Sequence, residues 1–158
     1  MAAKDAIKES RIEVRVGRGL AEVQEAAARI RRRAHELAAE RGFAGVHALD
    51  DWLRAENELF YVPASELREA ETEYSLHVLI PVRALETIAV NIEPRSVAVW
   101  GGAPAGETDN RELFCQHTLP HPVVVEMATA FFDSGELTVT LPKRSELSIG
   151  DAGRPAAA

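Results

Sequence analysis

The spacing of apolar residues changes along this chain, and the first period is that of a strand. Between residues 11 and 16 apolar and charged side chains alternate, so that one face carries Ile12, Val14 and Val16. A period of two predicts a strand, and glycines at positions 17 and 19 end it. We therefore expect residues 1–19 to form a flexible arm with a possible short strand, for which the sequence names no partner.

From residue 20 the apolar residues recur every three or four positions, which is the period of a helix. This first stripe consists of Val23, Ala27, Ile30, Ala34 and Leu37. Gly42 suits the end of the helix because glycine takes a positive φ without a steric clash. A second helix is predicted over residues 48–59, with an inner side made of Leu49, Trp52, Leu53, Glu56 and Leu59. The two helices predict a helical hairpin domain over residues 20–62.

Strand signals take over after Pro63. Short β-rich runs cover residues 74–80, 88–93, 97–100, 113–119, 127–132 and 136–141, and the second and third of these read as a hairpin. Several short strands without interleaved helices predict an antiparallel sandwich of about seven strands over residues 63–143. The fold class is therefore α+β, a helical hairpin followed by an immunoglobulin-like β-sandwich. Residues 144–158 form a small, polar C-terminal extension.

Composition excludes several classes of function. The 158 residues are 46% hydrophobic and 27% charged, which is typical of a soluble globular protein. The formal net charge of −7 argues against a nucleic-acid partner. No apolar run approaches the ~20 residues of a membrane span, and the N-terminus lacks the apolar stretch of a secretory signal. We expect a cytoplasmic protein with no membrane partner.

Candidate chemistry is sparse. The chain lacks a Walker-type phosphate loop, a Gly-x-Ser-x-Gly elbow and a His-Glu-x-x-His motif, so we expect neither an enzyme nor a cofactor. Cys115, His117 and His121 have a spacing that suggests zinc, but a structural zinc site needs four ligands. Ordinary packing in a strand is the favoured interpretation, and we expect no metal. The single cysteine excludes an internal disulfide.

The end of the strand region carries a family resemblance. It reads Ala130-Phe131-Phe132-Asp133-Ser134-Gly135-Glu136-Leu137-Thr138-Val139-Thr140-Leu141-Pro142-Lys143. This segment resembles the closing signature of the alpha-crystallin domain of small heat shock proteins, whose marked positions here are Gly135, Leu137, Leu141 and Pro142. An acidic lead-in before Tyr74, the strand-ending Pro81 and the pair Leu119-Pro120 also fit the family. Residues 29–59 are similar to a small uncharacterised bacterial helical domain.

Three features depart from the family pattern. Val82 stands where glycine is usual, and Cys115 stands where an arginine is common. The connection over residues 101–112 is also shorter than in relatives that exchange a loop strand between partners, which disfavours a strand-exchanged dimer.

The resemblance implies a chaperone that works without ATP. Such a holdase binds unfolded or partly unfolded client proteins, limits their aggregation and assembles into a homo-oligomer of two or more copies. In the family a C-terminal Ile-x-Ile-type motif fills a groove at the sandwich edge of a neighbour. Leu147 and Ile149 fit that motif, although they could equally be incidental apolar residues of the tail. The receiving groove would be lined by residues that could instead be plain core, namely Val90, Ile92, Ala130 and Phe132.

A different function stays open. A sandwich of this kind could be a non-enzymatic, co-chaperone-like interaction module that binds one defined folded partner. The shorter connection over residues 101–112 and the missing arginine at position 115 favour this alternative.

Overall fold

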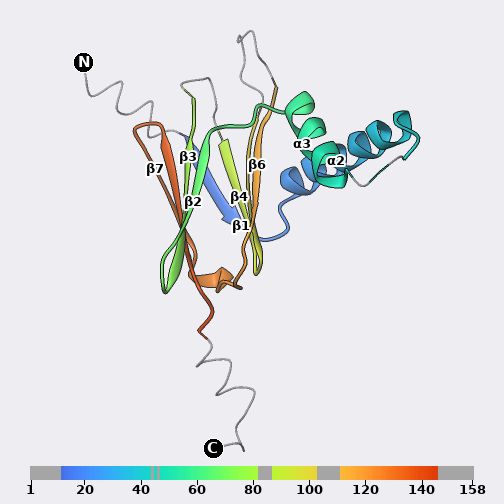
Figure 1. The fold of residues 1–158 in the computed structure, drawn as a ribbon. Helices are drawn as coiled ribbons and strands as arrows, with labels where there is room; N and C mark the ends of the chain where they lie inside the picture. The colour runs from blue at the N-terminus through green and yellow to red at the C-terminus, as the bar shows by residue number, and fades with distance from the viewer. Residues whose placement is uncertain (1–11, 44, 46, 82–86, 103–110, 146–158) are drawn as a thin grey trace, which may run out of the picture.

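A computed structural model describes residues 12–43, 45, 47–81, 87–102 and 111–145. Two four-stranded sheets face each other, and two helices lie at one side (Figure 1). The first sheet has the order β1-β4-β5-β6 and the second has the order β2-β3-β8-β7. The predicted α+β sandwich with its preceding helical hairpin is confirmed: the described part of residues 63–143 contains seven strands, and the short strand near the N-terminus is an eighth.

The strands of the first sheet are β1 (Glu13–Gly17), β4 (Thr87–Glu93), β5 (Ser96–Gly101) and β6 (Leu113–Thr118). Those of the second are β2 (Ser65–Glu69), β3 (Glu73–Leu79), β8 (Glu136–Pro142) and β7 (Thr129–Asp133). A short 3-10 helix, Val125–Met127, precedes β7. All neighbouring strands are antiparallel except one pair, because β1 runs parallel to β4. The predicted antiparallel pairing holds for the strands within residues 63–143, and the parallel pair is that of β1, for which the sequence named no partner.

The sandwich core is apolar and closed. Alternate residues of β3 and β8 face inward, so Leu76 lies opposite Val139 and Val78 lies opposite Leu137, all of them fully buried. Leu141 of the family signature is also fully buried. Alternation of this kind places every second side chain of a strand on the same face.

Gly135 of the family signature lies in a turn that needs a positive φ. β7 and β8 are joined by a two-residue turn in which Ser134 has φ 52° and Gly135 has φ 81°. Two positive φ values are typical of the tight hairpin turn whose twist matches that of paired strands. The carbonyl of Gly135 also accepts a hydrogen bond from the backbone N–H of Ile80 (2.8 Å). Pro142, the last residue of β8, accepts one from Val124 in the same way (2.8 Å).

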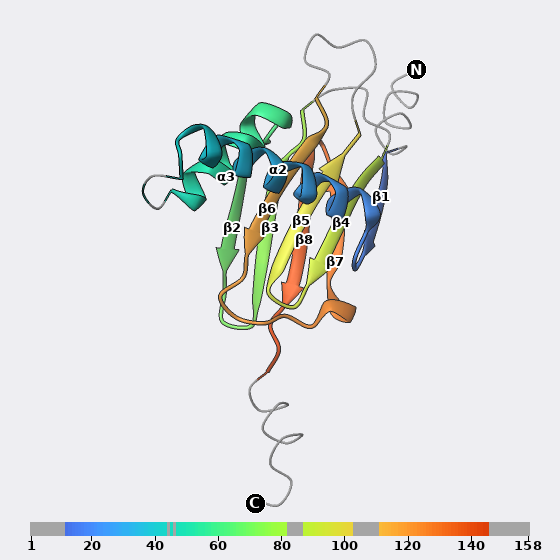
Figure 2. The same cartoon turned by 90° about the vertical axis from the view of Figure 1, so that its right-hand side faces the viewer.

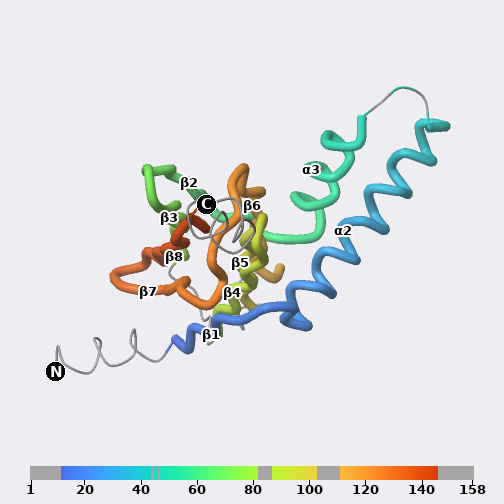
Figure 3. Tube along the Cα trace, turned by 90° about the horizontal axis from the view of Figure 1, so that it is seen from below, coloured from blue at the N-terminus to red at the C-terminus, as the bar shows by residue number. Residues whose placement is uncertain are grey.

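The helical hairpin consists of α2 (Ala21–Glu40) and α3 (Ala48–Leu59). The beginning of α2 lies across the outer face of the β1-β4-β5-β6 sheet (Figure 2), and the far end of the hairpin extends away from the sandwich (Figure 3). A second apolar cluster joins the helices to the sheet and includes Val23, Ala26, Ile30, Ala55, Phe60, Ala98 and Phe114. None of the helices in the described part of the chain is long and apolar enough to span a bilayer.

The predicted inner side of α3 is wrong for two residues. Leu49 and Leu53 have exposed fractions of 69% and 45%, and the buried residues of α3 are Asp51, Ala55 and Glu56. Arg41 donates hydrogen bonds to both carboxylate oxygens of Asp51, each 2.8 Å long. This ion pair closes the hairpin and turns the Asp51 side of α3 toward α2. It also holds the pKa of Asp51 below its ordinary value.

The short strand predicted near the N-terminus is present as β1, in the first sheet. The proposed boundaries at residues 19, 62 and 143 remain predictions.

Candidate functional site

The edge of the sandwich next to β4 holds an extra strand. β1 pairs with β4 over five residues, with Val14 opposite Ile88 and Val16 opposite Val90. Paired residues of neighbouring strands point to the same face of a sheet, and Ile88 and Val90 are fully buried in the sandwich core. Ile12 and Val14 accordingly pack against this core, whereas Val16 has an exposed fraction of 44%.

The four residues predicted to line a groove lie on β4 and β7. Val90 and Ile92 of β4 are fully buried, and Ala130 and Phe132 of β7 are half-buried. All four belong to one apolar cluster, against which Ile12 and Val14 also pack. We call the edge of the sandwich between β4 and β7 the edge groove, after the receiving groove predicted from these four residues, whose role in docking remains a prediction. In this structure β1 lies along it. Leu147 and Ile149 lie outside the described residues, so their docking remains a prediction.

Polar contacts fix the segment between β1 and α2. The side chain of Asn91, on β4, accepts a hydrogen bond from the backbone N–H of Leu20 (2.8 Å). Asn91 has an exposed fraction of 7%, so this bond is shielded from water. Arg15 and Glu22 form an ion pair across the turn, and Arg18 lies 3.8 Å from Glu93. The end of β1 and the start of α2 are thus tied to the same strand.

The helical hairpin is fixed to the sheet by a small set of contacts. Phe114 of β6 is fully buried in the helix–sheet cluster, and its ring centroid lies 5.5 Å from that of Phe60. The carboxylate of Glu112 accepts hydrogen bonds from the Trp100 indole (2.7 Å) and from Arg29 (3.2 Å). The Arg29 guanidinium also lies over the Phe60 ring, 4.7 Å from its centroid. These contacts join α2 to the outer face of β5 and β6.

Glu56 is an acidic side chain buried at the inner face of α3, with an exposed fraction of 6%. Burial raises the pKa of its carboxyl, and a hydrogen bond with Trp52 opposes this in part. A raised pKa means that the folded state favours the neutral acid. The resulting stabilisation is complete below the ordinary pKa of glutamate and is lost as the pH rises through the folded value. At neutral pH the ionised Glu56 therefore destabilises the hairpin.

Replacing Glu56 by glutamine should raise the melting temperature at pH 7 by a few degrees, because glutamine keeps a hydrogen-bonding group and has no charge to desolvate. The gain should disappear at about pH 4, near the ordinary pKa of a glutamate. Thermal denaturation followed by circular dichroism at both pH values measures it. Glu25→Gln, on the exposed side of α2, is the matched control. A stabilisation that is the same at both pH values would contradict the explanation.

The three residues with zinc-like spacing do not converge. Cys115 is buried opposite Val99 in the core, where burial raises the pKa of its thiol to about 12. His117 Nε2 is 2.8 Å from the Ser65 hydroxyl, and burial lowers its pKa. His121 is exposed, and its Nε2 lies 3.7 Å from Glu69. Among the residues that the structure describes, no group of three His, Cys, Asp or Glu side chains gathers as a metal site requires.

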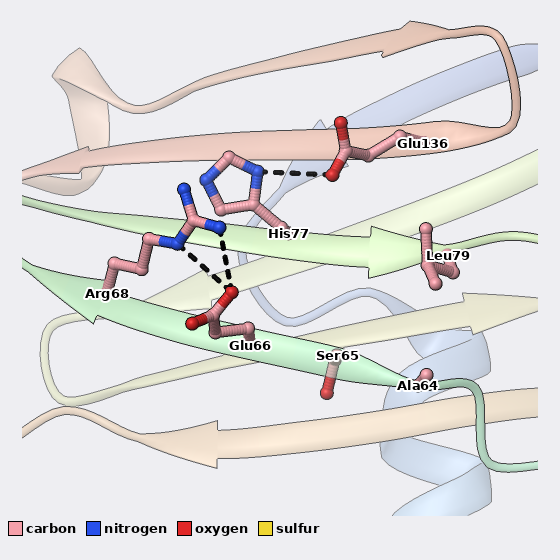
Figure 4. Close-up of a pocket in the computed structure, with 7 residues that line it drawn as sticks. All are labelled: Ala64, Ser65, Glu66, Arg68, His77, Leu79 and Glu136. Carbon is pink, nitrogen blue, oxygen red and sulfur yellow. Dashed lines mark hydrogen bonds and ion pairs between the residues drawn. The ribbon is translucent and has the colours of Figure 1, made fainter.

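A shallow pocket lies on the outer face of the β2-β3-β8-β7 sheet (Figure 4). Its charged side chains pair with one another: Arg68 donates to Glu66 at 2.9 and 3.0 Å, and His77 Nδ1 is 3.4 Å from Glu136. The lining combines two carboxylates, one guanidinium and one histidine with the apolar side chains of Ala64 and Leu79. It offers no evident chemistry, and the edge groove is the stronger candidate site.

Comparison with known structures identifies the fold of the sandwich. Heat shock protein 16.0 from Schizosaccharomyces pombe superimposes with a TM-score of 0.50 at 20% identity, over 66% of this chain and 89% of that one. The strand half has the fold of a small heat shock protein. Other small heat shock proteins are similar at lower scores. HSP18.5 from E. histolytica has a TM-score of 0.44 at 22% identity, over 54% of this chain and 91% of that one. The protein hspA from Xanthomonas axonopodis has a TM-score of 0.47 at 19% identity, over 53% of this chain and 95% of that one.

The helical hairpin gives a different result. Residues 25–60 match the model of a protein family of unknown function, DUF2934. No curated protein matches the chain. The small heat shock protein fold thus accounts for the sandwich, and the hairpin matches a family that has no assigned activity.

The groove residues named from the sequence remain a prediction, and the sequence did not identify β4 as the partner of β1. The alternation of Ile12, Val14 and Val16 was the available signal, because it matches the apolar-x-apolar pattern expected of a strand that fills such a groove.

Proposed function

We propose that this chain is an ATP-independent holdase that binds partly unfolded proteins and limits their aggregation. The observation that supports the proposal is the β4 edge of a small heat shock protein fold, where β1, a strand with alternating apolar residues, pairs with β4 and packs against the apolar core. Strand addition gives affinity through backbone hydrogen bonds and selects side chains by the pockets beneath them. Unfolded clients expose segments of this kind, and their capture needs no nucleotide and no catalysis.

Exposed apolar side chains on the hairpin support a second contact area. Phe43, Leu49 and Leu53 have exposed fractions of 59%, 69% and 45%. Surfaces of this kind mark sites of interaction with other proteins. The hairpin would therefore contribute to client capture or to assembly.

Assembly would use the C-terminal tail. Replacing Leu147 and Ile149 together by alanine should shrink the homo-oligomer, because the tail of one copy would lose the two side chains that fill the edge groove of a neighbour. Multi-angle light scattering measures the mass. Ser148→Ala, between the two residues, is the matched control and should leave the mass unchanged. An unchanged mass in the double variant would show that Leu147 and Ile149 take no part in assembly.

An aggregation assay tests the holdase function. The chain should suppress the light scattering of several unrelated heated clients at near-stoichiometric ratios, with ATP neither required nor helpful. An equal mass of an inert protein controls for crowding. Absence of protection for every client would refute the proposal. The cytoplasm is the compartment that we propose for this activity.

A second candidate function is an interaction module that binds one defined folded partner. The observation that favours it is that β1 already lies in the edge groove, which disfavours indiscriminate capture. Such a module would protect no heated client but would bind its partner as a stable complex.

A further inference from the structure

We infer that β1 is a strap over the edge groove and that the helical hairpin holds the strap closed. Release of the hairpin from the sheet would then uncover the β4 edge. What enters the opened groove rests on the proposed holdase function, whereas the coupling between strap and hairpin does not. The strap consists of residues 12–17.

The strap alone has a weak hold on the sandwich. It is a five-residue strand whose ladder partner is β4, and parallel pairing is slightly less stable per residue than antiparallel pairing. Ile12 and Val14 are half-buried and Val16 has an exposed fraction of 44%. A short strand with little buried area belongs to the part of a protein that opens with little free energy.

The connection to the hairpin is too short to let the two move apart. Three residues, Arg18 to Leu20, separate the end of β1 from the start of α2. Three extended residues span at most about 10 Å, so a larger displacement of α2 must pull β1 away from β4. The Arg15–Glu22 ion pair joins strap and helix directly. The Leu20–Asn91 hydrogen bond anchors their junction to β4.

The hairpin is attached to the sheet at its base, through the beginning of α2 and the end of α3, and not along its length. Val23, Ala26 and Ile30 share the helix–sheet cluster with Ala98 and Phe114, whereas the far end of the hairpin extends beyond the sandwich (Figure 3). A partner that bound the exposed Leu49 and Leu53 side of α3 would act at a distance from that attachment. Binding of a partner at the outer face of the hairpin would thereby release β1 from the edge groove.

Native-state hydrogen exchange of the full chain tests the coupling. In the wild type, the amides of β1 and those of the first turns of α2 should open with the same free energy and the same dependence on denaturant, as one cooperative unit. Opening of β1 alone, with α2 still protected, would overturn the inference. The measurement needs no client, so its outcome is independent of whether the chain is a holdase.

The variant Ala98→Glu tests whether release of α2 causes release of β1. Ala98 lies under α2 on β5 with an exposed fraction of 4%, and a buried unpaired charge there should lift the helix. Exchange of the β1 amides should rise about tenfold or more, together with that of α2 and with β3 and β8 unchanged. Leu53→Glu places the same charge on the exposed side of α3 and should change neither. Faster exchange in α2 with β1 as protected as in the wild type would refute the coupling.

A linker insertion keeps the inference testable if Ala98→Glu disturbs the whole sandwich or leaves α2 docked. Inserting about six Gly-Ser residues between Arg18 and Gly19 adds up to ~20 Å of reach. In this variant β1 and α2 should open independently, with different free energies and different denaturant dependence. Opening that remains a single unit despite the longer linker would show that the short connection is not what couples them. If the holdase proposal is also correct, Ala98→Glu should protect a heated client at a lower ratio of chain to client than the wild type does.

Discussion

When Ile12 and Val14 are both replaced by aspartate, the chain should protect a heated client from aggregation at a markedly lower ratio of chain to client than the wild type requires. Burial of these two side chains contributes roughly 1–2 kcal/mol to strap closure, and each 1.4 kcal/mol changes an equilibrium about tenfold. The open population of the edge groove should therefore rise by about one order of magnitude. Light scattering of the heated client over a series of ratios measures the effect.

The control for this variant lies on the same strand. Glu13 is exposed on the opposite face of β1, so Glu13→Asp should leave the protective ratio unchanged. If the double aspartate variant lost protection, β1 would be part of the client-binding surface and not its cover. The same change of the protective ratio in Glu13→Asp would mean that any substitution in β1 produces the effect, and not the loss of its apolar contacts.

Replacing Phe114 by alanine should lower the free energy of unfolding by about 3–5 kcal/mol, the range for large aromatic residues removed from a core. Phe114 is fully buried between the helices and the sheet, and its loss leaves a cavity beside Phe60. Urea denaturation followed by tryptophan fluorescence measures the change. Phe131→Ala provides the matched deletion, because that ring on β7 has an exposed fraction of 67%, and its effect should stay within about 0.5 kcal/mol.

The outcome of Phe114→Ala also reports on how the hairpin is attached. A loss near the expected range would mean that the hairpin and the sandwich unfold as one unit. A loss below ~1 kcal/mol, similar to that of an exposed position, would mean that the cluster around Phe114 adds little to the stability of the sandwich.

Local patterns predicted much of this fold. The second helix has the predicted bounds, Ala48–Leu59, because acidic residues in its first turn and a regular apolar spacing mark it clearly. The β4–β5 hairpin and the turn at Gly135 were also correct. Each of these features depends on interactions within a few residues of sequence, which a periodicity or a turn motif contains.

The errors involve distant contacts or polar strands. β2 was missed as a strand because its residues, Ser-Glu-Leu-Arg-Glu, are those of a polar sheet edge and show little apolar alternation. The partner of β1 lies about 70 residues further along the chain, and no local signal encodes such a pairing. Leu49 and Leu53 were placed inside because hydrophobicity alone does not register the Arg41–Asp51 ion pair that sets the rotation of α3.

The parallel pairing of β1 with β4 has a consequence for biosynthesis. β1 is made before its partner, and at least 70 residues must be added before β4 can offer it an edge. Pairing between segments so far apart forms slowly, because a long loop must close before any contact stabilises it. Among the eight strands in the described part of the chain, the first to leave the ribosome is thus expected to be among the last to join its sheet. Until it does, the nascent chain carries an uncovered sheet edge, the kind of surface on which aggregation begins.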